Sequence, residues 1–512
     1  MSDRRRLAAI SPYWVAFVLC AAASAVPFLV TYRVPMTDLP QHAAQLAIWK
    51  HYNDACYGFF RIFYKDWLTP YLLGYGIARL FAFVASINSA LKLTAYIAVV
   101  ALPLALRELT RRASLDDFLS LLGLPLAFGF SFGYGFLNFI VAIPIGILFV
   151  AWAFDYARRP TVKVGVALTL MSLLLLASHA LVYALCLAIA VTMHLGSGQR
   201  IRSFAPYAVS VPLALLWVVR VRSREASVHA PPVWSGLLFR PANFPLNLLS
   251  SGWDPAALGF SLLFAFAAYL IGVKPAADRR RWIPLIIAAV CYFFLPSPAF
   301  GTAALYERFA VFCGSFALFA LDRREPVVNA TVARAWIVAL ILVWAGLMSL
   351  RFHAFGRDAA NFDRIVDGIP ANARVLFLDV DPGSVAVPGV PFLHFESYYQ
   401  ERRGGIVGRS FASHFPELIR YRPGNDPGTF LYLDWYPWMF QWGRDSNFDW
   451  FLVRAPGNLR QSLFAHAQEP LDLQGHFGMW WLYAKHKRPE PSQCAPFEPE
   501  DREATASERS PG

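Results

Sequence analysis

Long runs of hydrophobic residues, separated by short polar loops, dominate the first 350 residues of the chain. Many of these runs approach the ~20 residues that an α-helix needs to cross a lipid bilayer. The pattern therefore predicts a mainly α-helical, polytopic membrane bundle over residues 1–350. The predicted spans lie at roughly 12–31, 67–85, 89–106, 117–134, 137–154, 162–178, 180–196, 204–220, 255–273, 283–298, 304–321 and 333–350.

Arginine residues concentrate in the short loops between these runs. By the positive-inside rule such loops are cytoplasmic, together with the arginine-rich N-terminus. An even number of spans would return the polar C-terminal segment to the cytoplasm, whereas we expect that segment outside, so one assignment is wrong and we predict 11 to 13 spans. The uncertain region is 86–136, where either the pair 67–85 and 89–106 does not span fully or a later helix is broken near Gly129, Gly133 and Gly135.

From about residue 351 the hydrophobic runs shorten to the length of β-strands. A buried strand is predicted at 375–378 after a helix at 361–369, and further strands at 430–435, 449–453 and 478–484. We expect an extracytoplasmic α/β or α+β domain over 351–487. The tail 488–512 is rich in Pro, Glu and Ser and is predicted to be disordered.

Composition agrees with a membrane protein. The chain is 57% hydrophobic and only 16% charged, below the usual charge content of soluble domains. The net charge of +12 comes from arginines in loops, which indicates a lipid bilayer as partner and no nucleic acid. Four of the six cysteines lie in apolar runs and are expected to pack there, whereas Cys56 and Cys494 fall outside the membrane and could form one disulfide.

The polar loop after the first run holds the most informative motif, Asp38-Leu39-Pro40-Gln41-His42. Pro40 suits the first turn of a helix, and residues four apart share a helix face, so Asp38 and His42 are expected to project together. This places an acidic and a basic group where a membrane enzyme would bind a lipid-linked substrate. The alternative is that Asp38 only caps the helix, with Gln41 completing a capping box and His42 exposed.

Further candidate residues lie in loops that the topology places on the same face. Glu307 and Arg308 stand at the mouth of a span, where ionisable groups are costly and often functional. Arg220 and Arg222 lie outside against the positive-inside bias, and guanidinium groups bind phosphate with paired donors. The simpler alternatives are an ion pair at a helix end for the first pair and a solvated headgroup-facing cluster for the second.

Three other features have simpler explanations that we favour. Asp116 and Asp117 are expected to cap a helix, although an external loop would let them add a carboxylate to the Asp38 site. His179, between two apolar runs, is expected to be a packed turn residue. The Asp379-Val380-Asp381-Pro382-Gly383 sequence resembles a metal–nucleotide motif, but Pro-Gly favours a tight turn.

The order of these features resembles the GT-C superfamily of integral-membrane glycosyltransferases, which includes protein O-mannosyltransferases, aminoarabinose transferases and oligosaccharyltransferases. It is most similar to bacterial members with a D-L-P-x-H loop and a later G-F-x-N-F motif. Here the two motifs are Asp38 to His42 and Gly135-Phe136-Leu137-Asn138-Phe139. The similarity of layout covers most of residues 1–350, but the similarity of motif covers only these positions.

The resemblance implies transfer of a sugar from a polyprenyl-phosphate donor to an acceptor outside the bacterial inner membrane. Asp38 would act as general base or help to hold a divalent cation, Mg²⁺ or Mn²⁺. His42 would orient the acceptor or contact the phosphate, and Arg308 would neutralise the leaving phosphate. Unlike the mannosyltransferases, the loop has no adjacent pair of acidic residues. The alternatives are a transporter or flippase of lipid-linked sugars, and a non-catalytic envelope assembly protein.

Overall fold

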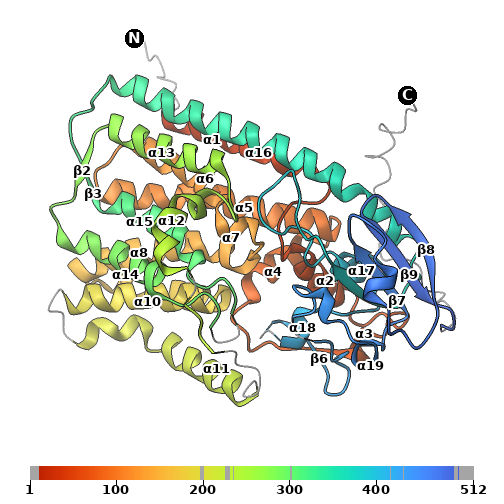
Figure 1. Ribbon diagram of the computed structural model, residues 1–512. Coiled ribbons are helices and arrows are strands. Elements are labelled where there is room, and N and C mark those ends of the chain that lie inside the picture. Colours follow the sequence, from red (N-terminus) through yellow and green to blue (C-terminus); the bar gives the residue numbers. More distant parts are fainter. Residues whose placement is uncertain are drawn as a thin grey trace, which may run out of the picture.

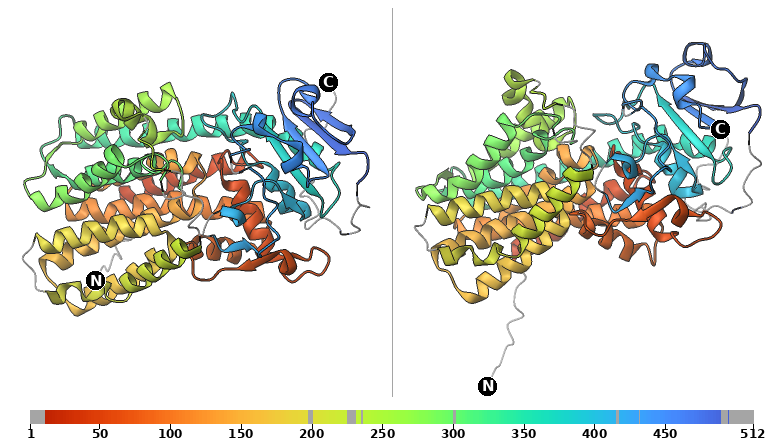
Figure 2. Two further views of the ribbon diagram at one scale, coloured as in Figure 1. Left: turned by 60° about the horizontal axis from the view of Figure 1, so that its bottom comes forward. Right: turned by 90° about the horizontal axis from the view of Figure 1, so that it is seen from below.

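The computed structural model describes residues 11–488 and Cys494, apart from 197–200, 225–230, 235, 300–301, 415–416 and 431. The protein is mainly helical. Its helices form an elongated bundle, and a mixed sheet from the C-terminal part of the chain lies at one end of that bundle, which we call the sheet end (Figures 1 and 2). The predicted disordered tail lies outside the described residues, except for Arg488 and Cys494.

The bundle is made of long and short helices and two minor strands. Their bounds are α1 Pro12–Leu29, α4 Leu72–Phe81, α5 Ile87–Arg112, η1 Asp117–Leu122, α6 Gly123–Ala127, α7 Phe130–Gly133, α8 Leu137–Arg158, α9 Val162–Ser178, α10 Ala180–Leu195, η2 Ile201–Tyr207, α11 Ser210–Arg224, η3 Leu237–Phe239, α12 Arg240–Leu249, α13 Pro255–Leu270, β2 Val273–Pro275, η4 Arg279–Trp282, α14 Ile283–Phe294, η5 Glu307–Phe309, α15 Ala310–Phe319, β3 Leu321–Arg323 and α16 Ala330–Val366.

Four of the described helices, α1, α5, α8 and α16, are long and apolar enough to cross a membrane. The other apolar helices are shorter than 18 residues, so the predicted number of 11 to 13 spans stays a prediction. Helix α16 has 37 residues, or about 55 Å, and exceeds a hydrocarbon core of about 30 Å. It joins the predicted span at 333–350 and the predicted helix at 361–369 into one rod that reaches the sheet (Figure 1).

Both of the anticipated irregularities are present, one just before the uncertain region 86–136 and one within it. Helix α4 has ten residues, about 15 Å, and is too short to span, so 67–85 and 89–106 are not two full spans. The predicted span at 117–134 is broken into η1, α6 and α7. The broken segment is buried in protein, where irregular backbone is tolerated at membrane depth.

The C-terminal sheet has the strand order β5-β4-β7-β9-β8, with the first three strands parallel and the last two antiparallel to their neighbours. One face packs on the end of α16, where Phe362 contacts Trp480, and a second apolar core covers the other face. The elements are β4 Arg374–Asp379, α17 Glu396–Arg403, β5 Ile406–Val407, α18 Phe411–His414, β6 Ile419–Tyr421, η6 Pro437–Met439, α19 Trp442–Asp445, β7 Trp450–Arg454, α20 Arg460–Leu463, β8 Leu471–Phe477 and β9 Trp480–Lys485.

Three of the four predicted strands are confirmed as β4, β7 and β9. The predicted strand at 430–435 is wrong, because the described residues there form consecutive tight turns closed by backbone hydrogen bonds. Aromatic and β-branched residues favour a strand only where a neighbouring strand can pair with it. Here Leu433 instead packs into the second apolar core, which covers one face of the sheet.

The first polar loop is folded into the C-terminal region. It contains α2 Leu39–Lys50, α3 Phe59–Ile62 and β1 Phe63–Lys65, and β1 pairs antiparallel with β6. Gln45 donates to the carbonyl of Ile419 and accepts from its amide. Arg33 pairs with Asp363 at 2.8 Å and lies 3.7 Å from the centre of the Tyr398 ring. Figure 1 shows α2 and α3 beside α17, α18 and β6.

A disulfide joins Cys56 in this loop to Cys494, and the other four cysteines are free. We expect Cys56→Ser to lower the unfolding free energy by about 2–4 kcal/mol, since the cross-link restricts the unfolded chain. Cys494→Ser should have the same effect and the double variant no more. Thermal unfolding in lipid nanodiscs measures the loss of stability in each variant. Mobility on non-reducing gels shows whether the disulfide is present. Full maleimide labelling of both thiols in unreduced protein would contradict the bond.

Candidate functional site

Asp38 lies at the N-terminal end of α2, but its carboxylate makes no capping hydrogen bond to the helix. The side chain is buried, and its Oδ1 lies 3.4 Å from Nε2 of His394 in the C-terminal region. The alternative in which Asp38 serves only as a helix cap is therefore wrong. A buried carboxylate that is not used for the helix end is available for chemistry or for holding another side chain.

The backbone around Asp38 rests on the broken segment that precedes α8. The amide of Thr37 donates to the carbonyl of Gly133 at 3.1 Å, and the amide of Asp38 donates to the carbonyl of Tyr134 at 3.0 Å. Gly135 has φ +87°, and a Cβ there would lie 2.6 Å from the Asp38 nitrogen. The two sequence motifs, 100 residues apart, thus form one structural unit, and only glycine allows this approach.

His42 is on the same helix but is buried instead of exposed. Its Nδ1 is 2.7 Å from the hydroxyl of Tyr75, which also interacts with Glu417. Burial lowers the pKa of His42 to about 4, against the opposing charge of Asp38, and burial raises the pKa of Glu417 to about 8. His42 is therefore neutral near pH 7 and has the geometry of a positioning residue rather than of a cation for phosphate.

The C-terminal region adds three polar residues that sequence reasoning missed. Nδ1 of His394 lies 3.9 Å from Oδ2 of Asp434, and this oxygen lies 3.5 Å from Nε of Arg409. With Asp38 they form an alternating row of acidic and basic groups, all largely shielded from solvent. Asp434 could have been noticed as the single charged residue within the apolar stretch 430–443. His394 has no comparable sequence signal.

Arg308 approaches the site from the bundle. Its guanidinium is buried, stacks 3.4 Å from the centre of the Phe136 ring, and donates to the carbonyls of Ala303 and Ala304. It is close enough to Asp38 and Tyr134 for their charges to act on it. The structure thus places Arg308 within electrostatic range of Asp38, and their service in one functional site stays a prediction.

Glu307, the neighbour of Arg308, accepts a hydrogen bond from Ser297 at 3.0 Å. It lies beside Arg308 in η5, which packs against α7 of the broken segment. The other predicted arginines are placed differently. Arg220 pairs with Asp66 at 2.9 Å and thereby ties α11 to the first loop. Arg222 lies within α11, but its side chain is outside the described residues.

The acidic pair Asp116 and Asp117 was expected to cap a helix, and Asp116 does so, whereas Asp117 forms an ion pair instead. Asp116 accepts from the amide of Phe118 and pairs with Arg334 at 2.7 Å, near the start of α16. Asp117 pairs with Arg107, which lies 4.3 Å from the centre of the Tyr13 ring at the start of α1. Both carboxylates are therefore at the end of the bundle opposite the sheet, and the suggestion that they serve the Asp38 site is wrong.

His179 caps α10 by accepting from the amide of Leu181, and its ring packs against Tyr71 and Phe139. Asp381 accepts from the amide of Gly383, as expected for a turn. Asp379, at the carboxyl end of β4, is buried, and burial raises its pKa to about 8. Among the described residues, no three His, Cys, Asp or Glu side chains are grouped so as to hold a metal ion.

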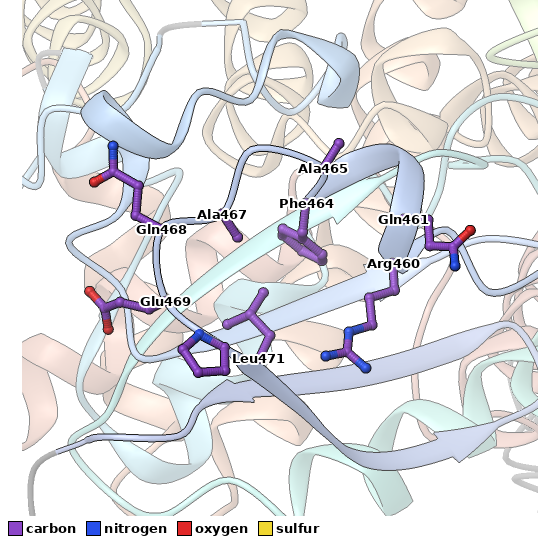
Figure 3. Close-up of a pocket in the computed structure, with 9 residues that line it drawn as sticks. Arg460, Gln461, Phe464, Ala465, Ala467, Gln468, Glu469 and Leu471 are labelled. Carbon is purple, nitrogen blue, oxygen red and sulfur yellow. The ribbon is translucent and has the colours of Figure 1, made fainter.

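A surface hollow of about 590 Å³ lies between α20 and β8, lined by residues 460–471 (Figure 3). Arg460, Gln461 and Glu469 supply polar groups there, and Phe464 and Leu471 form its apolar floor. None of the lining residues belongs to the group around Asp38. The hollow is therefore separate from the candidate site.

No protein-family model matches the chain, and no curated protein sequence matches it. Solved structures with a similar arrangement include the mycobacterial arabinofuranosyltransferase AftD, with 14% sequence identity and a TM-score of 0.44. That match covers 92% of this chain and 40% of AftD, so the protein spans less than half the length of the solved relative.

Proposed function

We propose that the protein is a membrane glycosyltransferase that moves a sugar from a polyprenyl-phosphate donor to an acceptor hydroxyl. The observation that carries this proposal is the buried Asp38 carboxylate. It makes no hydrogen bond to its helix, is held by His394, and has the Arg308 cation within electrostatic range. Glycosyl transfer from a lipid phosphate releases a proton from the acceptor hydroxyl and leaves negative charge on the phosphate. A base at the end of the hydrophobic bundle can accept that proton, and a neighbouring cation can stabilise that negative charge.

The proposed reaction needs one proton acceptor and one site for negative charge. Asp38 accepts the proton of the acceptor hydroxyl while the hydroxyl oxygen forms a bond to the anomeric carbon. The bond from that carbon to the phosphate oxygen breaks, and the lipid phosphate leaves with the electron pair. Arg308 uses two of its five donors on backbone carbonyls and has others left to bind the phosphate.

The fold supports a location of this site on the outer side of a bacterial inner membrane. The last turns of α5, which carry Arg107, Arg111 and Arg112, lie opposite the sheet end, as the positive-inside rule expects for a cytoplasmic side. The Cys56–Cys494 bond lies at the sheet end, and disulfides persist in oxidising compartments. We therefore place the N-terminus in the cytoplasm and the C-terminal region outside.

The test is transfer of radiolabelled sugar from polyprenyl-phosphate donors by the purified protein in lipid. Transfer to an added cell-envelope extract establishes the enzyme. Absence of transfer from every donor, combined with movement of the labelled lipid between leaflets of proteoliposomes, would replace the proposal by the flippase alternative. Loss of the cellular phenotype on deleting the C-terminal region, with Asp38→Ala silent, would favour the assembly protein.

His394 is expected to position Asp38 in this reaction. His394→Ala should lower kcat for transfer by about 10–100-fold with little change in donor KM, because the base loses its alignment while the donor site is intact. Added imidazole should restore part of the lost kcat. A matched control is His466→Ala, on an exposed position of the C-terminal region. Equal losses in both variants, or no rescue by imidazole, would reduce His394 to a structural role.

A further inference from the structure

The segment 432–439 carries both buried and exposed side chains. Leu433 and Asp434 are buried, whereas Tyr432, Trp435, Tyr436 and Trp438 are exposed, with Tyr436 60% and Trp438 58% accessible. Exposed aromatic clusters of this size are uncommon unless they bind something, because each ring costs free energy in water. The cluster, which we call the aromatic segment, is not used by the chemistry at Asp38.

The aromatic segment is held in place by the fold. The amide of Trp435 donates to the carbonyl of Tyr432 at 3.1 Å, and the amide of Met439 donates to the carbonyl of Tyr436 at 2.9 Å. Directly after the segment, Phe440 packs edge-on against Phe451 of the sheet. Rings presented on such an anchored backbone lose little freedom when a ligand covers them, which favours binding.

The segment is continuous with the candidate site. Asp434 points inward, and its Oδ2 lies 3.9 Å from His394, whose other ring nitrogen lies 3.4 Å from Asp38. The exposed Trp435 directly follows Asp434 in the chain, so the aromatic segment adjoins the row that holds the proposed base along the backbone. An acceptor with more than one sugar would extend from the reacting hydroxyl onto a surface in this position.

The charge of the segment argues against one usual partner of exposed Trp and Tyr, an anionic membrane surface. Residues 430–441 contain no Lys or Arg, and Asp434 is their only charged residue. Segments that bind anionic membrane surfaces are rich in Lys and Arg. Sugar rings, by contrast, are neutral, present apolar C–H faces that pack on aromatic rings, and carry hydroxyls that donate to a carboxylate.

We propose that the aromatic segment binds the carbohydrate chain of an oligosaccharide acceptor. This inference rests on the proposed transferase function for its place in the reaction, but binding itself requires no transfer. The rings would hold the sugars beyond the reacting one, and Asp434 would accept from a hydroxyl at the junction. The acceptor class is then a glycan of several residues rather than a single sugar or a protein side chain.

Isothermal titration of the full-length protein in nanodiscs with linear hexasaccharides of mannose, glucose and galactose tests the proposal. At least one should bind, and Tyr436→Ala and Trp438→Ala should each raise its Kd by about five- to tenfold, since each removes one stacking surface. Phe477→Ala, an exposed aromatic residue on the far edge strand β8, is the control and should leave Kd unchanged.

Failure of the two proposals can be told apart. Binding without any transfer activity would keep the aromatic segment as a carbohydrate site and reject the transferase. Lack of binding to all three hexasaccharides, or equal weakening by Phe477→Ala, overturns the carbohydrate proposal whatever the transfer assay shows. Quenching of Trp438 fluorescence by brominated lipids, measured as the difference from Trp438→Phe, would show insertion into the bilayer and also overturn it.

Discussion

Asp38→Asn is expected to lower the rate of glycosyl transfer by about 10²–10⁴-fold, the usual contribution of a general base. The amide keeps the size of the side chain and its capacity to accept from His394, but it cannot take a proton from the acceptor. Because Asp38 makes no capping hydrogen bond, α2 should not be destabilised by the change. The measurement is kcat and KM for radiolabelled transfer in nanodiscs, with thermal unfolding recorded for the same samples.

The control for this prediction is Asp426→Asn. Asp426 is exposed and accepts from the amide of Gly428, a bond that asparagine can also make, so rate and stability should stay as in the wild type. Donor KM should be little changed in Asp38→Asn, since Arg308 and the bundle remain. Full activity of Asp38→Asn in a folded protein would show that Asp38 is not the general base. The main argument for the site would then be lost.

Gly135→Ala is expected to lower the unfolding free energy by about 2–5 kcal/mol and to reduce transfer in the protein that remains folded. The new Cβ meets two penalties. The backbone has φ +87°, which disfavours an L side chain, and the Cβ would lie 2.6 Å from the Asp38 nitrogen, a distance that neither backbone can accept. Relief requires the start of α2 to move away from the broken segment and to carry the Asp38 carboxylate with it.

Gly424→Ala separates the two penalties. Gly424 has φ +83°, but a Cβ there would meet nothing within 4 Å, so this variant should lose only the roughly 1–2 kcal/mol of conformational strain and keep its activity. Thermal unfolding and transfer rates of both variants are compared in nanodiscs. If Gly135→Ala behaves like Gly424→Ala in both measurements, the contact between the two motifs does not position Asp38.

The helical part of the fold was largely predictable from the chain, for a simple physical reason. Apolar side chains in long runs have to leave water, and the helix satisfies the backbone hydrogen bonds within the run itself. The positions of α1, α5, α8 and α16 follow from that requirement alone. The helix bounds in 117–134 did not, because α6 and α7 begin or end at Gly123, Gly129 and Gly133, which pack against other elements.

The candidate site was predictable only in part. Asp38 and Arg308 were identified because charged residues next to apolar runs are costly and therefore noticeable. The sequence left open whether His42 is exposed, and it is buried because Tyr75 and, from the C-terminal region, Phe411 pack against it. His394 was missed because a single histidine in a loop carries no pattern.

The sequence by itself determined the four long apolar helices, three of the five strands of the C-terminal sheet and the position of the Asp38 motif. These depend on local periodicity and on the cost of burying charge, both of which can be read from neighbouring residues. Only the tertiary structure decided that Gly135 supports Asp38 and that His394 and Asp434 complete the row. Such contacts join segments hundreds of residues apart, and they arise from the packing of the first loop between the bundle and the sheet.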